Sequence, residues 1–301
     1  MQKIITPVVT PLNGSGEIDY DATKRVIDFL VENGVDGILV FGTMGEFIGF
    51  GMEEKIEYLR FYSDYVNGKV KLFAGTGSSN SKETIQMSKI ATECGYQASV
   101  IIAPYYYHAT QKQLYVYYNE IVKEIDGNVL LYNFPARTGY SMDVSIILEL
   151  VKGNKNIVGI KDSVIDIAHT SSIKNQIENE RFEVYSGFDN HFLNNMSFRG
   201  AGCIGGLSNI VPDLWSDLVK YTNDKEYDIA IKLFSLVDEL MPLYSLPCST
   251  AKLFKMLMKT RGISISSQTM FPYNEVEAID FEYAKDLLDK VLTKYNQMII
   301  S

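Results

Sequence analysis

Short apolar runs rich in valine and isoleucine recur along the chain, and a longer segment with the apolar spacing of a helix follows each of them. This alternation predicts βα units and a parallel sheet. The runs are apolar on both faces, which is typical of parallel strands covered by helices. The eight candidate strands are residues 4–9, 37–42, 70–75, 98–103, 128–133, 156–161, 182–187 and 202–206.

The segments between these runs carry helix signals. Ala22, Val26, Phe29 and Leu30 follow helical spacing, and Asn33-Gly34 is a suitable helix end. A second helix is predicted from near residue 81 to Gly95, and a third over 111–125. Eight βα units in about 220 residues predict a (β/α)8 TIM barrel of the α/β class. No GxGxxG follows the first strand, which disfavours the rival doubly wound sheet.

The strand signal fades after residue 222. Residues 224–241, 248–261 and 280–298 are predicted to be helices, with prolines as breaks between them. We therefore expect a catalytic barrel over 1–222 and a C-terminal helical extension over 223–301 that packs on the barrel.

Composition narrows the function classes. The 301 residues are 46% hydrophobic with a net charge of −9, and no basic cluster favours nucleic acid. No apolar run is long enough to span a membrane. The N-terminal stretch MQKIITPVV is too short for a secretory signal. The cysteines (Cys94, Cys203, Cys248) and histidines (His108, His169, His191) are scattered. We expect no disulfide framework and no bound metal, and the cysteine pattern fits a cytoplasmic protein.

Candidate chemistry lies at the strand ends, because barrel enzymes place catalytic groups at the carboxyl ends of their strands. The run 156–161 ends in Lys161, although burying an ammonium is costly. Burial disfavours the charged form, so Lys161 would supply a neutral amine to attack a carbonyl. Tyr132 ends the neighbouring run and can transfer protons. The turn around Thr43 offers a hydroxyl and backbone N–H groups to a carboxylate. Together these residues predict Schiff-base chemistry on a 2-oxo acid.

Each feature alone also has a purely structural interpretation. A lysine at a strand end is usually a solvated charge, and a tyrosine such as Tyr132 usually packs in a core. Arg137 alone would be a surface cation, and Asp189 with Asn190 would cap a helix. Their joint placement on one predicted rim favours the chemical interpretation.

A set of motifs then carries a family resemblance. The stretches TPLNGSGEID, GTMGE, AGTGS, APYYY, YNFPARTG, GIKDS, GFD and GAGCIGGLSN occur in this order along the chain. With them the chain resembles the dihydrodipicolinate synthase/N-acetylneuraminate lyase family of class I aldolases over essentially its whole length. The resemblance implies a pyruvate-dependent carbon–carbon lyase that needs no cofactor and forms a homotetramer, as a dimer of dimers.

The resemblance also implies residue roles. Lys161 would form the Schiff base with pyruvate, and Tyr132 would transfer the proton. Thr43 would touch the pyruvate carboxylate and link Tyr132 to a second tyrosine. That second tyrosine is matched by Tyr106, which in the family can reach over from a neighbouring subunit. The backbone of Ile204 would face the Schiff base, and Gly187 would face the ligand.

The motifs point to more than one substrate class. Met44 replaces the second hydroxyl residue that is usual in the synthases, so that only its backbone N–H remains for a carboxylate. Arg137 matches the arginine that the synthases use toward aspartate semialdehyde. Ser163, Asp189 and Asn190 instead suit the hydroxyls of a sugar acid. We favour aldol cleavage of a 2-keto-3-deoxy sugar acid to pyruvate and an aldehyde. The alternatives are 4-hydroxy-tetrahydrodipicolinate synthesis, for lysine biosynthesis, and cleavage of N-acetylneuraminate.

Two rivals come from other classes. One is a catalytically silent homologue that binds a ligand as a regulator, which the joint retention of Lys161, Tyr132, Thr43 and Tyr106 disfavours. The other is a phosphate-binding barrel enzyme, with GAGCIGG as its anion site. That stretch has only Arg199 nearby as a cation, which disfavours this rival.

Overall fold

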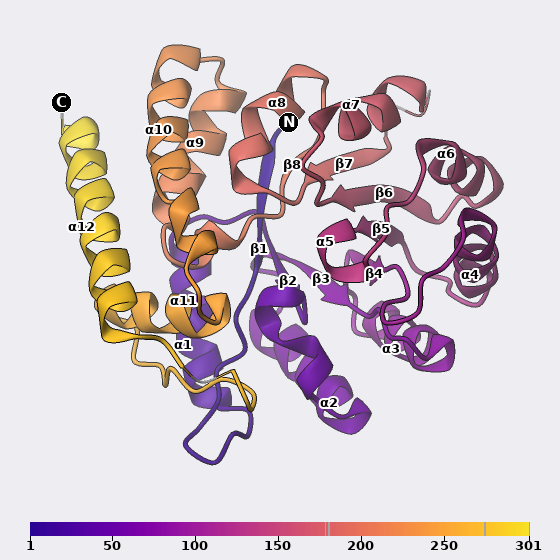
Figure 1. The fold of residues 1–301 in the computed structure, drawn as a ribbon, viewed down its shortest axis with the longest axis horizontal. Coiled ribbons are helices and arrows are strands. Elements are labelled where there is room, and N and C mark those ends of the chain that lie inside the picture. The colour runs from indigo at the N-terminus through magenta and orange to yellow at the C-terminus, as the bar shows by residue number, and fades with distance from the viewer. Residues whose placement is uncertain (178, 180, 274, 301) are drawn as a thin grey trace. The chain divides into compact units, whose positions relative to one another are not determined.

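The computed structural model of the chain describes residues 1–177, 179, 181–273 and 275–300 (Figure 1). Within these residues, eight strands form one closed barrel in the order β1 to β8, and the paired strands with known register run parallel. The predicted (β/α)8 barrel is therefore confirmed. The strands are β1 Lys3–Pro7, β2 Gly37–Val40, β3 Lys71–Gly75, β4 Ala98–Ile102, β5 Val129–Asn133, β6 Ile157–Asp162, β7 Glu183–Ser186 and β8 Gly202–Cys203.

The chain divides into two compact units. One unit contains Met1–Gln2 and Phe50–Ile204, and the other contains Lys3–Gly49 and Gly205–Ser301. Both units contain strands of the barrel, so this grouping is a different division from the one expected at residue 222. The division into a barrel and a helical extension stays a prediction.

The unit with Phe50–Ile204 carries strands β3 to β8. Its helices α3, α4, α6 and α7 lie outside the strands (Figure 1). Ile101, Leu131, Ile160 and Val184 from the strands are fully buried in one hydrophobic core with residues of α4, α6 and α7. The helical elements are α2 Met52–Val66, α3 Ser81–Glu93, α4 Gln111–Lys123, α5 Pro135–Thr138, α6 Val144–Gly153, α7 Ile167–Gln176, η3 Asp189–His191 and α8 Phe192–Ser197.

An irregularity in β6 sets the register of its carboxyl end. Val129 of β5 is paired with Ile157, whereas the next residue, Leu130, is paired with Gly159. One extra residue is therefore accommodated in β6, as in a β-bulge. A Cβ on Gly159 would lie 2.3 Å from the carbonyl oxygen of Glu183, so the close approach of the backbones requires a glycine. After the bulge, Lys161 rather than Ile160 stands beside Tyr132.

The unit with Gly205–Ser301 carries the predicted C-terminal helices. They are α10 Tyr227–Glu239, α11 Thr250–Thr260 and α12 Ala278–Ile300, and α12 contacts both of the other two. No helix in the described ranges is long and apolar enough to cross a membrane. The other helical elements of this unit are α1 Tyr20–Glu32, η1 Thr43–Gly45, η2 Phe47–Gly49, η4 Gly206–Asn209, α9 Pro212–Asn223 and η5 Met241–Ser245.

Candidate active site

Lys161 and Tyr132 form a buried pair at the ends of two neighbouring strands. They occupy paired positions of β6 and β5, and their exposed fractions are 3% and 5%. The Lys161 Nζ atom lies 4.4 Å from the centroid of the Tyr132 ring. The structure thus brings together the two residues that the sequence predicts as nucleophile and proton carrier.

Ser163, Gly187 and Ile204 lie one residue beyond three consecutive strands. Their N–H groups donate to the carbonyl oxygens of Asn133, Asp162 and Ser186, at 2.8, 2.9 and 2.9 Å respectively. Ser163 and Ile204 are buried. A Cβ on Gly187 would lie only 1.8 Å from the Ser163 Oγ atom, so these two residues are in tight contact. All three therefore stand at the carboxyl ends of their strands, where barrel enzymes place ligand-binding groups.

Asp189 adds a buried carboxyl group to this region. It begins η3, and only 1% of it is exposed. Burial raises the pKa of the Cys203 thiol well above its usual value, and the charge of Asp189 acts in the same direction. The Lys161 charge opposes this shift, so Asp189 and Lys161 both lie close enough to Cys203 to act on the pKa of its thiol. In the part of the chain that the structure describes, no three histidine, cysteine, aspartate or glutamate side chains are grouped to hold a metal ion.

An aromatic row leads from Tyr132 toward η3. The Tyr132 and Phe134 rings are stacked, with their centroids 5.8 Å apart. The Phe134 and Phe188 rings meet edge-on with centroids 6.2 Å apart, and the centroids of Phe188 and His191 are 5.6 Å apart. The exposed Arg137 guanidinium lies over the Phe134 ring, 5.9 Å from its centroid. Arg137 is thus linked to Tyr132 through a single aromatic side chain.

Two predicted residues have more open surroundings. Tyr106 is 88% exposed, its φ angle is +81°, and its ring packs edge-on against Tyr107. The structure does not bury Tyr106 with Lys161 and Tyr132. Asn190 lies in η3 beside Asp189 and is half-buried.

Thr43 and Met44 lie in η1, in the other compact unit, and both are half-buried. The turn is held by its own backbone, because Gly45 and Glu46 donate their N–H groups to Gly42 and Thr43. The hydroxyl of Thr10 also donates to the Gly45 carbonyl at 2.8 Å. Local hydrogen bonds therefore give this turn a defined shape.

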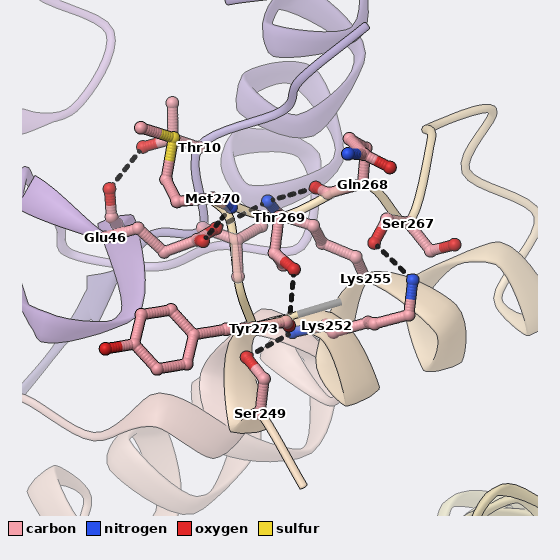
Figure 2. Close-up of polar contacts among 12 residues, drawn as sticks. Thr10, Glu46, Ser249, Lys252, Lys255, Ser267, Gln268, Thr269, Met270 and Tyr273 are labelled. Atoms are coloured by element: carbon pink, nitrogen blue, oxygen red, sulfur yellow. Dashed lines mark hydrogen bonds and ion pairs between the residues drawn. The ribbon is translucent and has the colours of Figure 1, made fainter. Parts of the chain in front are cut away.

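A buried ion pair extends from the same turn, as Figure 2 shows. The Lys255 Nζ atom donates to Glu46 Oε1 at 2.7 Å and to the Gln268 carbonyl at 2.8 Å. The other Glu46 oxygen accepts the Met270 N–H at 2.8 Å. Burial lowers the pKa of Lys255, and the adjacent Glu46 carboxylate opposes that shift. The pair ties the end of η1 to α11 and to the chain after it.

The sequence-based reasoning did not single out Lys255. A signal was present, because Ala251, Phe254 and Met258 mark a buried stripe at helical spacing and Lys255 lies within it. A lysine inside an apolar stripe needs a partner, and in this unit the partner is Glu46 of the GTMGE motif.

Comparison with known proteins places the chain in a family. Residues 1–291 match the Dihydrodipicolinate synthetase family, and the chain belongs to this family of pyruvate-dependent lyases. It is 30% identical over 290 residues to the putative 2-dehydro-3-deoxy-D-gluconate aldolase YagE of Escherichia coli, covering 96% of each chain. It is 32% identical over 297 residues to a 4-hydroxy-tetrahydrodipicolinate synthase of Hydrogenobaculum sp., covering 97% of this chain and 98% of the relative.

A solved structure supports the same assignment. The crystal structure of YagE from E. coli in complex with pyruvate superimposes with a TM-score of 0.93 at 30% identity, covering 97% of this chain and 98% of that one. The protein is therefore an enzyme of the aldolase and lyase class. Aldolases and synthases match it at similar identity, so its substrate is a separate question.

Proposed function

We propose that the protein is a class I aldolase in which Lys161 forms a Schiff base with a 2-oxo acid. The observation that carries this proposal is the contact of the buried Lys161 amine with the Tyr132 ring on paired strand positions. A lysine amine is the nucleophile that Schiff-base formation requires, and a phenol beside it can exchange protons with the bound substrate.

In the cleavage direction, the Lys161 nitrogen adds to the C2 carbonyl of the substrate, and water leaves to form the iminium. Tyr132 takes the proton from the C4 hydroxyl, and the C3–C4 bond breaks. The bonding electrons pass into the iminium, which gives the enamine of pyruvate and a free aldehyde. Protonation of the enamine and hydrolysis then release pyruvate and regenerate the amine. The reverse sequence condenses pyruvate with an aldehyde.

Three further residues complete the proposal for pyruvate. Thr43, through its hydroxyl, and Met44, through its N–H group, bind the carboxylate. Tyr106 completes the proton path from a neighbouring subunit of a homotetramer, and its exposed ring is available for such a contact. The family resemblance supports these roles and a cytoplasmic location.

For the remainder of the substrate we propose a 2-keto-3-deoxy sugar acid. The buried Asp189, Asn190 beside it and Ser163 offer oxygen and amide groups to a polyol chain. The similarity to YagE agrees with this choice. A specific observation favours the second candidate, dihydrodipicolinate synthesis. The exposed Arg137 guanidinium over Phe134 suits the carboxylate of aspartate semialdehyde.

Borohydride reduction in the presence of pyruvate tests the Schiff base. The wild-type protein should gain the mass of one reduced pyruvate on Lys161, whereas Lys161→Ala should gain none. Lys112→Ala, which removes an exposed lysine of α4, is the matched control and should be labelled normally. Absence of label on wild-type Lys161 would contradict the proposal.

A parallel assay distinguishes the substrates. The purified enzyme is supplied with 2-keto-3-deoxygluconate, with aspartate semialdehyde plus pyruvate, and with N-acetylneuraminate. The highest kcat/KM is expected for the sugar acid. Tyr132→Phe should lower kcat by about 10²- to 10⁴-fold, the usual contribution of a positioned acid or base, while pyruvate labelling of Lys161 remains detectable.

A further inference from the structure

A polar network lies on the far side of the strands from the Lys161–Tyr132 pair. Its centre is Asp162, the residue after Lys161, whose side chain is fully buried. The Asp162 carboxylate accepts hydrogen bonds from Asn133 Nδ2 at 2.9 Å, Thr170 Oγ1 at 2.7 Å and His169 Nδ1 at 2.9 Å. Three hydrogen-bond donors therefore converge on this one carboxyl group.

The second ring nitrogen of His169 also has an acceptor. Its Nε2 atom lies 2.8 Å from the carbonyl oxygen of Met142. A neutral imidazole carries one N–H, whereas a carboxylate and a carbonyl both require a donor. Both contacts are satisfied together when the ring is an imidazolium.

The network is joined to the catalytic pair through the strands. Asn133 and Asp162 are paired in the ladder, directly after the paired Tyr132 and Lys161. Successive side chains of a strand point to opposite faces, so the network occupies the outer face and the catalytic pair the inner one. Asn133 is itself fixed, because its Oδ1 atom accepts the Met142 N–H at 3.0 Å.

We propose that His169 is a positioning residue, which as an imidazolium holds Asp162 and Asn133 together and thereby fixes the Lys161 amine over the Tyr132 ring. The role assigned to Lys161 and Tyr132 rests on the proposed function, whereas the protonated state of His169 does not. The other two histidines have no such pair of acceptors in the described contacts. His108 Nε2 contacts the Gly139 carbonyl, and His191 packs against Phe188.

The charges around His169 agree with this state. Burial alone lowers the pKa of His169, but the hydrogen bond and charge of Asp162 outweigh it, with help from the Met142 carbonyl and Asp166, and the net shift is upward. α7 packs against α6, α8 and β7. On these elements, Glu149 and Lys152 of α6 are exposed, and Glu183 of β7 accepts a hydrogen bond from Tyr185. At the start of α8, burial lowers the pKa of His191, and the charge of Asp162 opposes that shift.

The sign of the pH dependence follows from that upward shift. The pKa of His169 in the folded protein lies above its value in the unfolded chain, about 6.5. The imidazolium contacts therefore stabilise the fold fully below about pH 6.5, and their contribution is lost as the pH rises through the folded-state pKa. Positioning of Lys161 should weaken over the same range.

Nitrogen-15 NMR of the histidine rings tests the protonation state without any substrate. The chain has three histidines, so His108→Gln and His191→Gln suffice to assign the signals. We expect the His169 ring to be protonated on both nitrogens at pH 6.5 and to titrate above its ordinary pKa. A His169 ring that carries one proton at pH 6 would overturn the proposal.

A second measurement tests the link to the active site. The rate of borohydride trapping with pyruvate is compared between wild type and His169→Gln from pH 6 to 9, and the ratio of the rates cancels the titration of groups that both proteins share. Glutamine keeps a donor but carries no charge. Wild type should be trapped about tenfold faster than His169→Gln at pH 6. The difference should lie in the maximal trapping rate (kcat) rather than in the pyruvate concentration for half-maximal rate (KM). The ratio of the two rates should fall toward one as the pH rises.

His108→Gln is the matched control, and its ratio to wild type should be constant across the pH range. A pH-independent ratio for a folded His169→Gln would show a merely structural role. If wild type is not labelled by pyruvate at all, the proposed function fails, while the NMR titration still decides the state of His169.

Discussion

Replacing Lys255 by methionine should destabilise the protein strongly. The change removes the ammonium that donates to Glu46 Oε1 at 2.7 Å and to the Gln268 carbonyl at 2.8 Å. Of the two donors described above for the Glu46 carboxylate, only the Met270 N–H then remains. Only 10% of the Glu46 side chain is exposed to solvent. Breaking a buried ion pair by removing one partner costs about 3–5 kcal/mol, because the remaining charge is left uncompensated. We expect about 3 kcal/mol, since the small exposed part of Glu46 gives its carboxylate some hydration.

Most of this loss should be shared with Glu46. Glu46→Gln removes the negative charge and should also cost about 3 kcal/mol, because the Lys255 ammonium then lacks its counter-charge. The double variant removes both charges, so it should cost about 4 kcal/mol rather than the sum of about 6 kcal/mol. A coupling energy of about 2 kcal/mol is expected, within the range for residues in direct contact.

Urea unfolding measured by circular dichroism supplies the free energies by linear extrapolation. Lys252→Met is the matched control, because Lys252 is on the same helix and its Nζ atom makes a longer contact, 3.4 Å, with the Ser267 carbonyl (Figure 2). It should cost less than about 1 kcal/mol. A stabilising ion pair is refuted if Lys255→Met costs no more than Lys252→Met, or if the effects of Lys255→Met and Glu46→Gln simply add.

Three further substitutions probe the turn after β7, the interior of β6 and Arg137 of α5. Gly187→Ala places a Cβ 1.8 Å from the Ser163 Oγ atom and should lower the free energy of unfolding in urea by about 1–3 kcal/mol. Adding Ser163→Ala should restore part of this loss. If nothing is restored, the clash is not with the Ser163 hydroxyl. Gly159→Ala meets the Glu183 backbone oxygen, which no rotamer change can move, so it should cost about 3 kcal/mol, and a neutral result would mean that the backbone yields there. Arg137→Ala should leave pyruvate labelling and sugar-acid cleavage nearly unchanged. If condensation with aspartate semialdehyde is instead the main activity and Arg137→Ala lowers it severely, the synthase function is favoured.

The barrel was predictable because its strands are short, apolar on both faces and separated by helices. All eight predicted strands are confirmed, most of them to within one or two residues at each end. The run 202–206 is the least accurate, since only Gly202–Cys203 forms a strand and Gly206 already begins η4. Glycines at 202, 205 and 206 carry no side-chain pattern, so the sequence cannot show where pairing stops.

The helices after residue 222 were also predictable from their apolar spacing. The predicted 224–241 corresponds to α10 followed by η5, the predicted 248–261 to α11, and the predicted 280–298 to α12. Their ends differ by a few residues because capping and the short η5 turn around Pro242 decide the boundaries locally. How the chain groups into compact units was less accessible, because that depends on contacts between residues that are distant in sequence.

Part of the candidate site depends on pairing that no local pattern reveals. The placement of Lys161 beside Tyr132 follows from neighbouring strands in a barrel, which the sequence predicts. The partners Asp162 and His169 are seven residues apart, and Glu46 and Lys255 are 209 apart, with the chain fold deciding both contacts. Such pairs are visible in a single sequence only as buried polar residues that still need a partner.

The bulge in β6 has a consequence for anyone who transplants or re-engineers this barrel. Between the extra residue near Ile157 and the amine of Lys161, the strand has a fixed length, because a one-residue insertion or deletion there would turn the lysine to the opposite face of the wall. The loop that precedes Ile157 lies before the irregularity, so its length can vary while the Lys161 side chain still points to the same face of the sheet. The segment from the bulge to Lys161 therefore has a constant length. Insertions and deletions in related designs should be placed in the loop before Ile157.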